Sequence, residues 1–168
     1  MIISDALRYE IADELLRRVR CEDRYDAELE AMLAMLPSYT QLGMAALLPN
    51  AQIALAEDQS GYVLMDGISS AGTAARDKIL KQAVPRSLAI RSEEFLTQNH
   101  DANRDTLRDH DIIYLYQNQI DDAGDKRESE ERIFEAVENA LDESIVLIKK
   151  LTAANATKII VTADHSFI

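Results

Sequence analysis

Acidic side chains lie in the stretches that follow three apolar segments of the sequence, each of strand length. In an open parallel sheet, ligands bind at the carboxyl ends of the strands, where loops gather side chains without disturbing the core. Carboxylates that converge there repel one another unless a cation neutralises them, and oxygen ligands with one imidazole suit Zn²⁺, Mn²⁺ or Mg²⁺. The residues are Asp5 after 1–4, Asp121, Asp122 and Asp125 after 112–116, and Asp164 with His165 after 158–162.

Each of these groups, taken alone, also has an ordinary structural explanation. An aspartate after a strand commonly forms a turn or caps a helix, which would account for Asp5. The run 121–125 has the composition of a solvated turn, and the pair 164–165 could form a surface hydrogen bond. The three groups are not independent, however, because one sheet edge would bring all of them together. Their joint placement favours a metal site over coincidence.

Thr40 offers a second kind of chemistry, because it stands before a predicted helix of small residues over 41–48. Free N–H groups and the helix dipole at a helix N-terminus hold phosphate oxygens and favour the alkoxide needed for attack. The alternative is an ordinary threonine N-cap, worth about 1 kcal/mol to the helix. The local sequence by itself favours that N-cap, and Ser38 is a weaker candidate nucleophile.

Hydrophobic periodicity predicts the elements that position these side chains. Predicted strands lie at 1–4, 62–65, 112–116 and 158–162. Predicted helices lie at 7–19, 26–36, 41–48, in a mixed stretch over 72–98 interrupted at Pro85, and along the stripe from Ile133 to Ile148; turns or loops lie at 66–67, 100–110 and 117–126. Strands that are apolar throughout and alternate with helices predict a three-layer α/β fold, in which helices flank a mostly parallel sheet.

Composition restricts the class of protein. The 168 residues are 47% hydrophobic and 29% charged, which fits one compact domain with a real core. One cysteine excludes an internal disulfide and, with no membrane-spanning apolar run, predicts a cytoplasmic protein. A net charge of −12 makes direct binding of nucleic acid by this surface unfavourable. Metal ions can reverse the potential locally, so the charge argues less against a metalloenzyme.

Three segments are similar to those of a known family and occur in the same order along essentially the whole chain. They are ISDALRYE at 3–10, LPSYTQLGMAALLP at 36–49, which is the most specific, and VTADH at 161–165. Together they resemble the PglZ domain, a member of the alkaline-phosphatase superfamily found in BREX-type phage-defence systems. The resemblance implies an alkaline-phosphatase-like core with a site for divalent metal ions.

The resemblance also implies a role for each matched residue. Asp5 matches an aspartate that ligates one metal ion, and Asp164 and His165 match further ligands of the same ion. Thr40 matches the nucleophile, which also bridges toward that ion.

For a second metal ion, Asp121 matches the aspartate that opens the site. Asp125 stands where many superfamily members have a histidine, an exchange that favours Mn²⁺ or Mg²⁺ over Zn²⁺. The superfamily normally adds a histidine from near the C-terminus, and this sequence stops at Ile168. The resemblance therefore implies that 1–168 is a partial domain without its C-terminal part, inactive by itself, of a parent that holds two metal ions.

The implied activity is hydrolysis of a phosphoester, by a phosphatase or a phosphodiesterase, through a phospho-threonine intermediate. The implied partners are a phosphorylated substrate and other phage-defence proteins. Two alternatives stay open: a structural or regulatory module that recruits partners in a defence complex, and a phosphomutase-type transferase. Asp125 and the acidic surface both fit the module.

Overall fold

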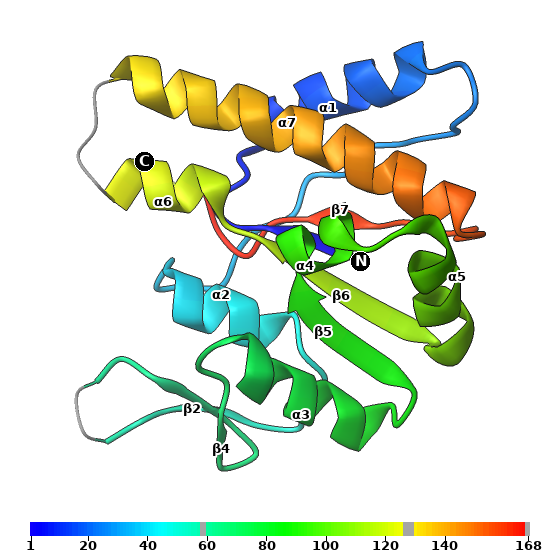
Figure 1. The fold of residues 1–168 in the computed structure, drawn as a ribbon. Coiled ribbons are helices and arrows are strands. Elements are labelled where there is room, and N and C mark those ends of the chain that lie inside the picture. Colours follow the sequence, from blue (N-terminus) through cyan, green and yellow to red (C-terminus); the bar gives the residue numbers. More distant parts are fainter. Residues whose placement is uncertain (58–59, 126–129, 167–168) are drawn as a thin grey trace.

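A four-stranded parallel sheet forms the centre of the computed structural model, which describes residues 1–57, 60–125 and 130–166, with the side chains of 123–125 and 130–132 left out. The strand order is β5-β6-β1-β7 (Figure 1). The strands are β1 (Ile2–Ser4), β5 (Ser87–Arg91), β6 (Ile112–Gln117) and β7 (Val161–Thr162). The predicted α/β fold is therefore confirmed, and three of its four main strands lie where the sequence predicts them.

Helices cover both faces of this sheet, which gives the three layers (Figure 1). The helices are α1 (Tyr9–Cys21) and α7 (Glu130–Ala153) on one face, and α2 (Thr40–Ala46) and α3 (Thr73–Ala83) on the other. Neighbouring residues of a strand point to opposite faces. Ile2 and Leu115 accordingly pack under α1 and α7, whereas Ile3 and Tyr116 pack with residues of α2 and α3. Both faces are apolar, as the uninterrupted hydrophobic strands predict.

A small antiparallel sheet packs beside α2, in the order β2-β3-β4. Its strands are β2 (Ile53–Leu55), β3 (Val63–Met65) and β4 (Ile68–Ser69). The predicted strand at 62–65 and the turn after it are confirmed, and Asp66 and Gly67 both have the positive φ that a tight hairpin requires. Strands β2 and β4 are too short for an alternation of apolar and polar residues to be recognised in the sequence.

The helix predicted over 26–36 is wrong, because that stretch is not helical. The chain must return from the far end of α1 to Thr40 at the carboxyl edge of the sheet. Extended backbone covers about 3.3–3.6 Å per residue and a helix about 1.5 Å, so only an extended path spans that length economically. Tyr25 and Ala27 pack on the core, whereas Leu33 is 98% exposed. The apolar composition of this segment suggested a helix that the topology excludes.

Three further assignments are corrected. Strand β5 lies inside the predicted helical stretch 72–98, between α3 and α4 (Ser92–Thr97). Residues 100–110, predicted as a loop, contain α5 (His100–Asp109), whose N-cap Asn99 accepts a hydrogen bond from the backbone N of Ala102 at 2.9 Å. The predicted loop 117–126 contains α6 (Gln119–Asp125). Polar composition concealed both helices, because neither needs a wide apolar face. Among the described residues, no helix combines the length and the apolar composition needed to cross a bilayer.

Candidate metal centre

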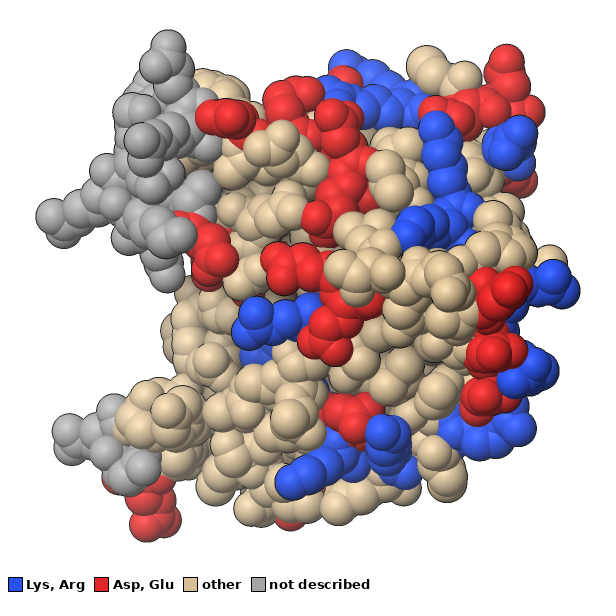
Figure 2. All heavy atoms as spheres, viewed as in Figure 1, with Lys and Arg blue, Asp and Glu red and all other residues tan. Residues whose placement is uncertain are grey.

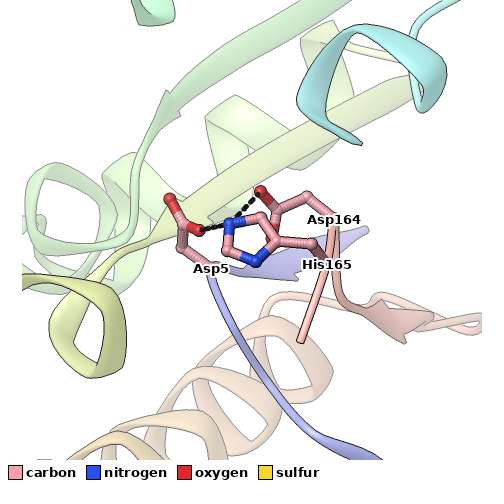
Figure 3. A group of neighbouring side chains, drawn as sticks. All are labelled: Asp5, Asp164 and His165. Carbon is pink, nitrogen blue, oxygen red and sulfur yellow. Dashed lines mark ion pairs between the residues drawn. The ribbon is translucent and has the colours of Figure 1, made fainter. Parts of the chain in front are cut away.

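Parallel pairing of β1 and β7 brings the two ends of the sequence together. Ile2 pairs with Val161 and Ile3 pairs with Thr162. Two residues further along each strand, Asp5 and Asp164 therefore leave the sheet side by side, which Figure 3 shows. The sheet register alone accounts for this meeting of residues from opposite ends of the chain.

One imidazole nitrogen faces three oxygen atoms at this edge. His165 Nε2 lies 3.3 Å from Asp5 Oδ1, 3.5 Å from Asp164 Oδ2 and 2.9 Å from Thr40 Oγ1 (Figure 3 shows the two carboxylates). Ligands that each lie about 2.1 Å from one ion are about 3.0–3.4 Å apart at octahedral or tetrahedral angles. The three distances from His165 Nε2 thus match, to within a few tenths of an ångström, the spacing of ligands around one ion. The four residues predicted for the first site are the ones the fold brings together.

Two oxygen atoms of this group are buried without a hydrogen-bond partner among the described residues, namely Asp5 Oδ1 and Asp164 Oδ2. Both lie near His165 Nε2, but without hydrogen-bond geometry. The Asp164 side chain is 0% exposed and that of His165 is 10% exposed. A buried acceptor without a partner costs roughly 1–3 kcal/mol, and more when charged. A cation at this point would satisfy both, so the residues fit a divalent metal ion.

Burial raises the pKa of Asp5 from its ordinary value of 3.8 to about 8, with the nearby charges of Asp164 and Asp121 as further causes. The positive charge of Arg76 acts in the opposite direction and lowers this pKa. Two buried carboxylates side by side cannot both ionise without a compensating cation. Without metal, Asp5 therefore holds a proton near neutral pH, and a divalent ion would replace that proton.

The backbone around the site is shaped to hold Asp164. Ala6 has a φ of 62°, and its N–H donates to Asp164 Oδ1 at 3.2 Å, which fixes one oxygen and leaves the other toward the centre. On the opposite side, Gly43 of α2 lies so close that a Cβ there would overlap the carbonyl of Asp164. This contact lets α2 approach the sheet edge and brings Thr40 to His165. The sequence analysis did not identify Gly43 or Ala6.

Thr40 is the first residue of α2, and its N-cap is Tyr39, so the prediction of Thr40 as the N-cap is wrong by one position. The hydroxyl does not cap the helix but points to the imidazole of His165. The ordinary structural role proposed as an alternative for this residue is therefore not the one it has. Ser38 is exposed and is not one of the donors around His165.

Asp121, in the first turn of α6, is half-buried, and its charge acts on Asp5. It is not part of the group formed by Asp5, Asp164 and His165. Asp122, next to it, bonds to Asn118 and so belongs to the turn itself. The side chain of Asp125 lies outside the described residues. Of the two residues predicted for the second site, the described side chains therefore include only Asp121, whose charge acts on the first site.

Arg76 is a buried cation that sequence analysis missed. It is 7% exposed, its Nε donates to the carbonyl of Ser70 at 3.2 Å, and its guanidinium carbon lies 5.0 Å from the ring centroid of Tyr116. Nothing in the sequence marks it, because an arginine in a helix is normally solvated. Its charge reaches Asp5, so it contributes to the electrostatics of the site.

Comparison with known proteins identifies the family. A family model described as "BREX system PglZ alkaline phosphatase-like domain" matches residues 1–168. The chain belongs to the PglZ family. It is 43% identical over 169 residues to "Alkaline phosphatase-like protein BrxZ" of Escherichia coli O9:H4 (strain HS), covering 100% of this chain and 19% of that protein. It is 38% identical over 169 residues to "Alkaline phosphatase-like protein PglZ" of Bacillus cereus (strain H3081.97), covering 100% of this chain and 20% of that protein.

The chain therefore spans about a fifth of the length of these PglZ relatives. No solved structure matches it. Family membership confirms the resemblance that the three segments indicated. In this PglZ domain the same segments supply Asp5, Thr40, Asp164 and His165, so the parts of the sequence that resemble the family are also the parts that build the site.

Proposed function

We propose that this PglZ domain is the metal-binding core of a phosphoester hydrolase, with Thr40 as its nucleophile. The observation that supports it best is the arrangement of His165 Nε2 among Asp5, Asp164 and Thr40 at 2.9–3.5 Å. The alkaline phosphatase-like description of the family adds to it. Phosphatases and phosphodiesterases use this chemistry alike, and the proposal includes both.

Asp5, Asp164 and His165, with the hydroxyl of Thr40 beside them, would hold a divalent ion, and three oxygen donors with one imidazole suit Zn²⁺, Mn²⁺ or Mg²⁺. The bound ion would supply Lewis-acid stabilisation of the Thr40 oxygen and of the phosphoryl oxygens. The close approach at Gly43 keeps the hydroxyl of Thr40 at the sheet edge beside His165, where it would lie next to the ion. Attack by Thr40 Oγ1 on phosphorus would release the alcohol and leave a phospho-threonine, which water then hydrolyses.

A second ion, bound in part by Asp121 and Asp125, belongs to the same proposal. The charge of Asp121 already acts on Asp5, so a cation between them would be attracted by both. The remaining ligands of this ion are proposed to lie in regions that correspond to the rest of the longer relatives. The surfaces that bind the substrate and any partner proteins of the defence system are proposed to lie there too.

Direct contact of this segment with nucleic acid is not part of the proposal. Acidic residues outnumber basic ones by 30 to 18. On the face drawn in Figure 2, described basic side chains alternate with acidic ones and form no continuous basic stripe. This face would therefore attract the phosphate backbone of a nucleic acid only weakly.

The proposal is tested in the full-length protein by Thr40→Ala, with Thr40→Ser as the matched control that keeps a hydroxyl. With bis(p-nitrophenyl) phosphate and p-nitrophenyl phosphate as probes, Thr40→Ala should lose turnover by about a thousandfold or more. Thr40→Ser should retain part of it. Metal content should stay close to wild type in both, because three ligands remain. Unchanged turnover of Thr40→Ala would move the nucleophile elsewhere.

A structural or regulatory module that recruits partners is the second candidate. The acidic surface and the single ligand group found among the described residues favour it. Metal content of the purified full-length protein and of Asp5→Ala separates the two functions. A folded wild-type protein without metal supports the module, whereas metal that is present and lost in Asp5→Ala supports the enzyme.

A further inference from the structure

A partly buried polar network lies on the face of the sheet covered by α7, and its hub is the half-buried carboxylate of Glu143. Oε1 accepts hydrogen bonds from Ser92 Oγ at 2.7 Å and from Gln117 Nε2 at 3.2 Å, and Oε2 accepts one from Gln119 Nε2. Ser92 and Gln117 are each 2% exposed. No basic side chain within the described part of the chain forms an ion pair with Glu143.

The donors come from the loops and strand ends that surround the site. Ser92 follows the last residue of β5, Gln117 is the last residue of β6, and Gln119 is the first residue of α6. Ser144, next to Glu143, donates to Gln117 Oε1 at 3.1 Å and so ties α7 to the same strand end. One carboxylate on α7 thereby fixes the carboxyl ends of two neighbouring strands and the start of the helix that carries Asp121.

The short helix α6 packs along α7. Ile120 is 1% exposed and packs with Ala6, the neighbour of Asp5, and with Ala140 of α7. The bond from Gln119 to Glu143 adds a polar contact to this packing. Gln119 Oε1 is buried without a partner among the described residues, so flipping the amide would turn an oxygen toward the carboxylate and lose the bond. The orientation of Gln119 therefore depends on Glu143 being an acceptor.

We infer that Glu143 is a positioning residue for the metal centre, which acts through Gln119 on Asp121. The inference rests on the proposed function. By holding the start of α6, Glu143 keeps the carboxylate of Asp121 where its charge acts on Asp5, and that negative charge raises the affinity of the centre for a divalent cation.

The test measures Mn²⁺ affinity of the full-length protein by isothermal titration. Glu143→Gln keeps Oε1 as an acceptor for Ser92 and Gln117 but puts an NH₂ group opposite Gln119. Gln119 could accept from that group only by flipping its amide, which would bury its own NH₂ group where Oε1 now has no partner among the described residues. Glu143→Gln should weaken Mn²⁺ binding about fivefold, the size of one lost hydrogen bond. Gln119→Ala removes the same bond from the other side and should give the same loss. Asp142→Asn removes a charge from the neighbouring position of α7, where Asp142 forms an ion pair with Arg18 at 3.2 Å, and should change the affinity less than twofold.

Two further combinations separate positioning from general damage. In an Asp121→Asn background, Glu143→Gln should weaken binding less than about twofold, because the group through which it acts is gone. The double variant Glu143→Gln with Gln119→Glu exchanges donor and acceptor and should bring the affinity back to within about twofold of wild type.

Equal losses from Glu143→Gln in both backgrounds, or no loss in either, would overturn the inference. Restoration by the exchange supports it, and failure of the exchange to restore affinity counts against it. The proposed function is judged separately by Asp5→Ala. Loss of Mn²⁺ binding in Asp5→Ala together with wild-type affinity in Glu143→Gln leaves the metal centre standing and removes only the role of Glu143.

Discussion

The carboxyl edge of the sheet carries two acidic regions that are held in different ways. Asp5 and Asp164 leave two paired strands in register, so main-chain hydrogen bonds determine where they lie. Asp121 sits on the short helix α6, which is placed by side-chain packing on α7, by Ile120 and by the bond from Gln119 to Glu143. The first region is positioned by backbone and the second by side chains. This difference predicts a rigid metal centre beside a carboxylate that can be adjusted.

The largest effect is expected from Asp164→Asn in the first region. Mn²⁺ affinity should fall about a hundredfold or more, because a buried charged ligand is lost from a fixed position. Asn keeps the acceptor for the N–H of Ala6 and offers an NH₂ to Asp5, so the metal-free protein should be at least as stable as wild type. Titration calorimetry and thermal unfolding in EDTA measure the two quantities. A large loss of stability in EDTA would show that Asp164 is mainly a structural residue.

Gly43→Ala tests how closely the first region is packed. The added Cβ would overlap the carbonyl of Asp164, and α2 would have to shift. We expect a loss of roughly 1–3 kcal/mol in the free energy of unfolding, measured in urea, together with weaker turnover because Thr40 moves with the helix. Ala46→Ser on the same helix is the control and should cost about 0.5 kcal/mol. Equal costs for both variants would contradict the close contact.

The raised pKa of Asp5 predicts a pH dependence of metal binding. Because Mn²⁺ must displace a proton from a group with a pKa of about 8, the affinity should rise about tenfold per pH unit from pH 6 to 8 and level off above. The stability of the metal-free protein should change in the opposite sense. The folded state holds this proton more tightly than the unfolded chain, so the contribution of Asp5 to stability is complete below about pH 4 and is lost as the pH rises through about 8.

Titration calorimetry and thermal unfolding in EDTA at several pH values measure both trends, and Asp5→Asn is the control that should abolish the second. A metal affinity independent of pH between 6 and 8 would contradict the proton on Asp5. This prediction concerns the backbone-held region alone, where burial is the largest cause of the shift.

The smallest effect is expected from Asp121→Asn on that pH profile. The charge of Asp121 raises the pKa of Asp5 but ranks behind burial and Asp164 as a cause. Its removal should move the levelling-off of the affinity to lower pH, by about half a unit or less. Asp122→Asn, one position along the same helix, should not move it. A shift as large as that caused by changing Asp164 would mean that the two regions are equally coupled to Asp5.

Several features of the site could be predicted from the sequence because their signals are local. Asp5 and the pair Asp164–His165 each follow an apolar strand directly, and the strand pattern predicts a parallel sheet that brings strand ends together. Thr40 was identified as a candidate before a small-residue helix, although its role as N-cap was wrong. The family resemblance rests on these same stretches. The mistaken helix at 26–36 shows the limit, since composition there was overridden by the distance the chain must cover.

What only the tertiary structure decided is which atoms meet across long sequence separations. The hydroxyl of Thr40 finds the imidazole of His165 across 125 positions, and the amide of Ala6 finds Asp164 across 158. No local sequence pattern marks Gly43 or Glu143. Gly43 is needed because α2 approaches the carbonyl of Asp164 closely, and Glu143 acts as an acceptor for Gln119, which is 24 positions away. Local order of apolar and polar residues determined the sheet and the types of group at its edge. Packing of the helices on that sheet determined which of those groups form a metal centre.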